Sequence, residues 1–160
     1  MKKAQIQQTF IYILTIILVG IILLIGYKSI GSIMSKGCDV EKTTFKSDIK
    51  ALVERYNSYG SLNREEMNAP CDYSKVCFVD ANEVGVGTFT TTNKIIKDSV
   101  NAGIEQNIFL IKEGSPSITE PIGFSEAIKV DSKIICINET NNKFKIQFEG
   151  TGKYTKISNQ

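Results

Sequence analysis

Residues 4–27 read AQIQQTFIYILTIILVGIILLIGY, and no side chain in this stretch carries a charge. From Phe10 to Gly26, 12 of the 17 residues are Ile, Leu or Val. A helix rises ~1.5 Å per residue, so about 20 such residues cover the roughly 30 Å hydrocarbon core of a bilayer. The interior Gly20 is tolerable because lipid offers the backbone no alternative to helical hydrogen bonds. The stretch predicts a transmembrane helix, with membrane lipid as its first partner.

Three other interpretations of this segment compete with a retained anchor. A buried soluble helix would need apolar partners on every face inside a small domain. A cleaved secretory signal has a shorter apolar region and a small-x-small cleavage site, which Tyr27–Gly31 does not resemble. In a lipoprotein signal an aliphatic and two small residues precede the lipidated cysteine, and before Cys38 only Gly37 fits. We therefore favour an anchor that stays attached.

Charge is divided unevenly along the chain. Residues 1–36 contain four lysines and no acidic residue, and the other residues hold 15 Lys and Arg against 17 Asp and Glu, a net charge of −2. A nearly neutral domain lacks the clustered cations that nucleic-acid binding requires. The composition therefore excludes nucleic acid as an expected partner.

All four cysteines follow the apolar segment. An even number in a small domain is typical of an oxidising compartment, where disulfides form. Buried reduced thiols are the alternative, and zinc is less favoured because the chain has no histidine and no Cys-x2-Cys. Lysines flank the span on both sides, so the cysteines decide the expected orientation, with the N-terminus cytoplasmic and the C-terminal domain outside. The disulfide candidates are Cys38, Cys71, Cys77 and Cys136.

Four cysteines allow three pairings, and the sequence does not decide among them. Short chain distance favours Cys71 with Cys77, which leaves Cys38 with Cys136.

Beyond the span, hydrophobic spacing predicts a helical stalk through Met34, with a break at Gly37 and Cys38. A second, amphipathic helix is expected from about Glu41 to Tyr59, ended by Gly60. The predicted organisation is a basic leader, transmembrane helix and stalk in residues 1–36, followed by an extracytoplasmic α+β domain in residues 37–160.

The second half of the chain carries strand signals. Lys143–Phe148 alternates strictly, which predicts a strand with Phe144, Ile146 and Phe148 inward. Residues 61–72 are expected to form a loop with a helical turn near 63–66, and residues 93–102 a short helix. Further strands are expected at 76–79, 108–111, 127–130, 134–137 and 154–157, with a hairpin joining 134–137 to 143–148. The fold class is therefore α+β with a mostly antiparallel sheet.

No motif in the chain indicates catalysis. Without histidine there is no ordinary Ser-His or Cys-His nucleophile and no common general base. The adjacent Glu65 and Glu66 are expected to diverge, and the spacing of Cys71 and Cys77 is unlike that of thiol exchange enzymes. We therefore expect neither an enzyme nor a cofactor nor a metal site. Asn138-Glu139-Thr140 is an acceptor motif for N-glycosylation on a predicted turn.

The N-terminus resembles that of type IV pilin-like proteins, in which a peptidase removes a short basic leader just before an unbroken apolar helix. The resemblance implies that Met1-Lys2-Lys3 is the leader, with cleavage between Lys3 and Ala4, as in archaeal-type leaders. Two positions depart from the family: Lys3 stands where glycine is usual, and Gln8 stands where bacterial members have glutamate. The resemblance covers under a fifth of the chain.

Two functions from different classes follow. The first is a pilin-like structural subunit of a filament or secretion-type assembly, which self-assembles or joins other pilin-like subunits through its N-terminal helix. The polar residues available between such helices are Gln5, Gln7, Gln8 and Thr15. The alternative is a plain membrane-anchored surface domain that binds a partner or ligand.

Overall fold

The computed structural model describes residues 2–159, and for residues 2–9 and 29–35 it describes the backbone alone. The chain has an α+β fold and divides into two compact units, Met1–Asp39 and Val40–Gln160. Each unit is considered separately below.

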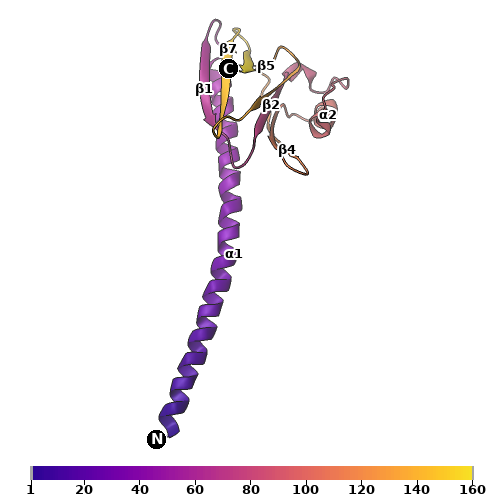
Figure 1. Ribbon diagram of the computed structural model, residues 1–160. Coiled ribbons are helices and arrows are strands. Elements are labelled where there is room, and N and C mark those ends of the chain that lie inside the picture. The colour runs from indigo at the N-terminus through magenta and orange to yellow at the C-terminus, as the bar shows by residue number, and fades with distance from the viewer. Residues whose placement is uncertain (1, 160) are drawn as a thin grey trace. The chain divides into compact units, whose positions relative to one another are not determined.

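Helix α1 is a single element of 54 residues, Lys2–Arg55, which Figure 1 draws as one unbroken coil. The predicted break at Gly37 and Cys38 is therefore wrong, and the expected second helix is the C-terminal part of α1. A glycine inside a helix costs only about 1 kcal/mol, which burial of the residues after it outweighs. Those residues include Phe45, Ile49 and Val53, which are buried in the second unit. The helix ends at Arg55, so the expected extension to Tyr59 with Gly60 as its terminating residue is wrong, although Gly60 does have a positive φ, +78°.

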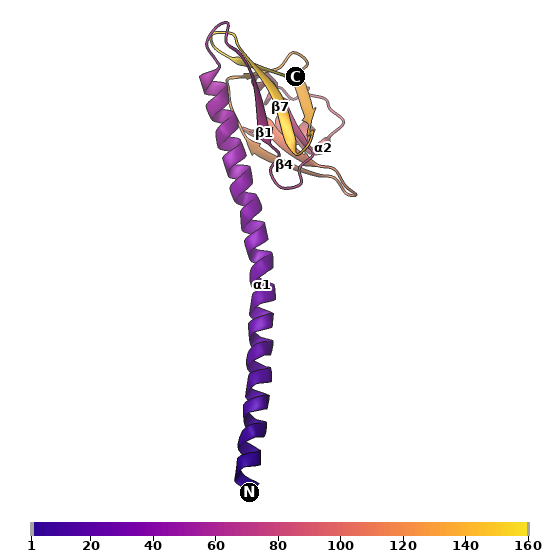
Figure 2. The same ribbon diagram turned by 60° about the vertical axis from the view of Figure 1, so that its left-hand side comes forward.

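The second unit contains two four-stranded sheets. Sheet A has the order β1 (Leu62–Asn68), β7 (Lys143–Gly150), β8 (Thr155–Asn159), β5 (Ile128–Lys129). Its pairs are antiparallel except β5 with β8, and Figure 2 shows β1 and β7 side by side. Sheet B is antiparallel throughout, in the order β4 (Ile118–Gly123), β3 (Ile108–Lys112), β2 (Lys75–Val79), β6 (Ile134–Asn138).

Three local predictions are wrong. Residues 62–68 form strand β1 rather than a loop with a helical turn, because pairing with β7 overrides the local signal of Arg64-Glu65-Glu66. Strand β4 was not among the expected strands; it lies at the edge of sheet B, where a strand tolerates a proline such as Pro121. Asn141 and Asn142 do form a turn with positive φ, but β6 and β7 enter different sheets instead of pairing as a hairpin.

The main core of the second unit lies between the two sheets and the C-terminal part of α1. The predicted inward residues of β7, Phe144, Ile146 and Phe148, are all fully buried. The ring of Phe45 on α1 lies 5.6 Å from that of Phe144. The Thr155 hydroxyl on β8 donates to the Val53 carbonyl oxygen at 2.6 Å, which ties the last turn of α1 to sheet A.

A second, smaller cluster covers the other face of sheet B. The predicted short helix is α2 (Lys94–Asn101), and the Asn93 side chain caps it by accepting from the amides of Ile95 and Ile96. A 3₁₀ turn, η1 (Ala81–Glu83), precedes it. The buried residues of this second cluster come from β2, β3, α2 and the loop before α2. They are Cys77, Val79, Phe89, Ile96, Val100 and Phe109.

Candidate functional site

Within the first unit, the apolar part of α1 is long enough to cross a membrane. The stretch Phe10–Lys28 meets that requirement by length and composition, and none of it is buried inside the structure. Large side chains along it are exposed, for example Leu24 at 71% and Tyr27 at 83%. An apolar surface of this extent is costly to expose to water.

The residues predicted to take part in leader cleavage and helix assembly lie in the first 15 positions of the chain. The backbone of Lys3, Ala4, Gln5, Gln7 and Gln8 is helical, but their side chains fall outside the described part of the structure. Thr15 is described, and its hydroxyl lies 2.7 Å from the Ile11 carbonyl oxygen and 2.9 Å from that of Tyr12. Its proton is therefore directed to its own helix, which leaves the oxygen to accept from a neighbouring helix.

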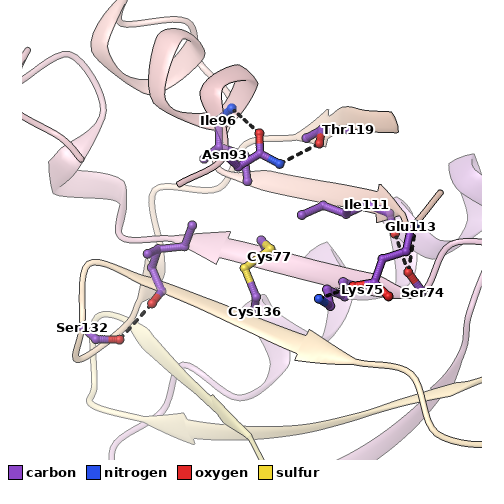
Figure 3. Close-up of a disulfide and its surroundings, with 11 residues drawn as sticks. Ser74, Lys75, Cys77, Asn93, Ile96, Ile111, Glu113, Thr119, Ser132 and Cys136 are labelled. Carbon is purple, nitrogen blue, oxygen red and sulfur yellow. Dashed lines mark hydrogen bonds and ion pairs between the residues drawn. A yellow bond between two sulfur atoms is a disulfide. The ribbon is translucent and has the colours of Figure 1, made fainter. Parts of the chain in front are cut away.

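The prediction that the four cysteines form disulfides is confirmed, but the expected pairing is wrong. Cys77 on β2 bonds to Cys136 on β6, 59 positions away in sequence. Antiparallel pairing of β2 with β6 places these residues opposite each other, with their Cα atoms 4.0 Å apart (Figure 3). Strand register therefore overrides chain distance. Cys38 and Cys71 are disulfide-bonded too, and no cysteine in the described structure is free.

An open groove of about 910 Å³ lies in the second unit. One wall is the exposed side of α1 from Val40 to Arg55, and the other is β1 with the turn that follows it. The groove meets β1 at the edge of sheet A, where the strand pairs with β7 on one side only. The lining residues are Val40, Glu41, Thr44, Phe45, Asp48, Ala51, Leu52, Arg55, Glu65–Asp72 and Asn142.

The groove is acidic, with five carboxylates and one cation, Arg55, in its lining. The Glu65 carboxylate accepts from the Tyr56 hydroxyl at 3.1 Å, and Glu41 accepts from the Cys71 amide at 2.7 Å. Successive side chains of a strand point to opposite faces, so the Glu66 side chain points away from the core-facing side on which Glu65 lies. Lys143, through a 3.1 Å hydrogen bond, and then Lys145 lower the pKa of Glu66.

An oppositely charged neighbour also shifts a side-chain pKa at two ion pairs outside β1. The Lys112 ammonium, 2.7 Å from Asp72, lowers the pKa of that carboxyl group. The Asp131 carboxylate, 2.9 Å from Lys156, raises the pKa of that lysine. Glu66 and Asp72 are exposed, and the half-buried Lys156 pairs with the exposed Asp131, so these pairs contribute little to stability.

The remaining predicted site residue, Asn138, ends strand β6 on the exposed side of the chain. Among the described residues no group of three or more His, Cys, Asp or Glu is arranged to hold a metal ion.

No protein-family model, curated protein or solved structure matches the chain.

The groove is the feature that the sequence did not reveal. One wall belongs to the amphipathic helix that the sequence predicted, but the other wall was expected to be a loop. The residues come together only because α1 continues to Arg55 and because residues 62–68 pair with β7. A weak signal was present, since Glu65, Met67 and Ala69 alternate with Glu66 and Asn68.

Proposed function

We propose that the chain is a membrane-anchored, pilin-like structural subunit of a filament or secretion-type assembly. The observation that carries the proposal is the unbroken course of α1 from Lys2 to Arg55. Its N-terminal part exposes apolar side chains throughout the described stretch 10–27, and residues 45, 49 and 53 contribute to the core of the second unit. One helix thus supplies both a membrane segment and part of the second unit's fold.

The proposal places the N-terminus in the cytoplasm and the second unit outside, and it assigns no catalysis. Leader removal between Lys3 and Ala4 leaves the apolar helix attached to the second unit. On assembly these helices leave lipid and pack against one another. Because lipid is already apolar, the gain comes from van der Waals packing and interhelical hydrogen bonds rather than from the hydrophobic effect. Glutamines 5, 7 and 8 and the Thr15 oxygen supply the polar atoms.

The experiment is a mass measurement of the mature protein isolated from its own membranes, together with analysis of material sheared from the cell surface. We expect an N-terminus at Ala4 and sedimentable assemblies that contain the chain. A photo-crosslinking residue at Leu18 should join copies in those assemblies and should not do so in detergent-dispersed monomer. A protein that keeps Lys2 and Lys3 and never enters an assembly would contradict the proposal.

The acidic groove favours a second candidate, a surface domain that binds a partner through basic side chains. Its excess of carboxylates is complementary to Lys and Arg, and the free edge of β1 offers backbone groups to an extended segment. Binding of a lysine-rich peptide to the full chain in detergent tests this candidate. Asp48→Lys in the groove should abolish it, whereas Asp98→Lys on α2 should not. Equal binding by both variants would rule the groove out.

A further inference from the structure

We propose that Asn138 carries an N-linked glycan in the native protein. The inference goes beyond either proposed function, because it requires that residues 138–140 meet an oligosaccharide transferase on the outer side of the membrane, which both functions allow. A bare Asn138 would therefore overturn this inference without deciding between a pilin-like subunit and a partner-binding domain. The acceptor motif is Asn138-Glu139-Thr140, and all three residues are exposed.

Strand geometry directs the Asn138 side chain away from the protein. On β6 the side chain of Ile137 is buried in the main core, and pleating turns Asn138 to the opposite face, the face of Cys136. Asn138 lies opposite Lys75 and is the last residue of β6, an end strand of sheet B. A saccharide on its amide nitrogen would extend into solvent without displacing a core side chain.

The chain around the motif can leave the sheet at small cost. After Asn138 the Glu139 amide donates to the Ser74 carbonyl oxygen, and then Thr140 and Lys143 exchange two backbone hydrogen bonds across the Asn141-Asn142 turn. Strand ends and turns open at a small fraction of the global unfolding free energy. A transferase can therefore bind the three residues in extended form, either before this segment folds or when it frays.

The chemistry is a group transfer from a lipid-phosphate-linked oligosaccharide. The Asn138 Nδ2 atom forms a bond to the anomeric carbon of the first sugar, while the bond from that carbon to the phosphate oxygen breaks. The lipid phosphate leaves with the electron pair, and the amide loses one proton to a base of the transferase. The Thr140 hydroxyl is the part of the motif that the transferase recognises two residues on.

Two neighbouring asparagines provide an internal control. Asn141 and Asn142 lie on the same exposed turn, but the residues two positions on are Lys143 and Phe144 rather than Ser or Thr. If exposure alone decided glycosylation, all three asparagines would carry a glycan. Recognition of the motif predicts a glycan on Asn138 only.

The experiment is glycopeptide mass spectrometry on the full chain isolated from membranes of the organism that encodes it, beside three variants. We expect one oligosaccharide on Asn138 in the wild type and in Thr140→Ser, and none on Asn141 or Asn142. Asn138→Gln and Thr140→Ala should lose the whole added mass and keep the thermal midpoint of unglycosylated wild-type protein, since neither side chain is in the core. An unmodified Asn138 in the wild type, or a glycan that persists in Thr140→Ala, would overturn the proposal.

Discussion

At the residue scale, Gly150 is fixed by close packing. A Cβ atom there would collide with the carbonyl oxygens of Tyr56 and Ser58 and with the Ser61 hydroxyl. Its amide also donates to the Ser61 carbonyl oxygen at 2.7 Å, so the strand cannot move away freely. The position joins β7 to the segment that follows α1, and only a residue without a side chain fits.

Gly150→Ala should therefore lower the free energy of unfolding by about 1–3 kcal/mol, the usual cost of overpacking a filled site. The matched control is Gly114→Ala, since a Cβ at Gly114 meets nothing closer than 3.6 Å. Denaturant unfolding of the full chain in detergent, followed by tyrosine signals, measures both. Equal midpoints for the two variants would show that the segment after α1 is not held against β7 as described.

Glu66 gives a pH-dependent prediction at the same scale. Lys143 first, and then Lys145, lower its pKa in the folded protein below the value in the unfolded chain. The folded state therefore gains stability from Glu66 above the unfolded pKa, and it loses that contribution as the pH falls through the folded pKa. The gain is small because the pair is exposed. NMR titration should show the pKa of Glu66 rising in Lys143→Ala and unchanged in Lys112→Ala, whose lysine pairs with Asp72. A rise in both variants would contradict the local origin of the shift.

At the element scale, the continuity of α1 through Gly37 is open to test. A glycine in a helix interior is less favourable than alanine by about 1 kcal/mol, and a Cβ at Gly37 meets nothing within 4 Å. Gly37→Ala should thus slow amide hydrogen exchange in the turns around it. Gly60→Ala is the contrasting variant, in which the same substitution is unfavourable, because Gly60 has a φ of +78° and alanine is strained there. Faster exchange around residue 37 in Gly37→Ala would indicate the break that the sequence alone predicted.

The sequence predicted an element of the fold when the signal for it lay within one segment of the chain. The alternation of Lys143–Phe148 is complete within one strand, so β7 and its buried face followed directly. Strand β1 becomes a strand only by pairing with β7, about 80 residues further along. The cysteine pairing failed for the same reason, since Cys136 meets Cys77 through the register of β2 and β6. The apolar helix was predicted from composition, whereas the groove required two distant segments at once.

At the scale of the whole molecule, the Cys77–Cys136 disulfide constrains the unfolded chain over a separation of 59 residues. The chain-entropy model assigns a loop of that length about 4 kcal/mol of stabilisation. Cys77→Ala combined with Cys136→Ala should lower the free energy of unfolding by about 2–4 kcal/mol, and peptide mapping of the wild type should recover the Cys77–Cys136 link. A map that links Cys71 to Cys77 instead would show that β2 and β6 pair differently from this structure.

Membrane attachment is the property of the whole chain on which both proposed functions depend. An arginine at the centre of a membrane helix costs about 2.5–3.5 kcal/mol on insertion scales, so two of them offset much of the gain from the surrounding Ile and Leu residues. Ile17 and Leu18 lie near the middle of the Phe10–Lys28 stretch and are exposed within their unit. The double variant Ile17→Arg, Leu18→Arg should be lost from the membrane fraction after an alkaline carbonate wash.

The control places the same substitutions outside that stretch, as Ser47→Arg with Glu54→Arg, both at exposed positions of α1. Wild type and control should stay with the membranes through the wash and enter the supernatant only on detergent extraction. The detergent step also separates inserted protein from filaments, which sediment in its presence. If the Ile17→Arg, Leu18→Arg chain resists carbonate as well as wild type does, the apolar part of α1 is not the anchor. The pilin-like proposal, in which this helix passes from lipid into an assembly, would then fail.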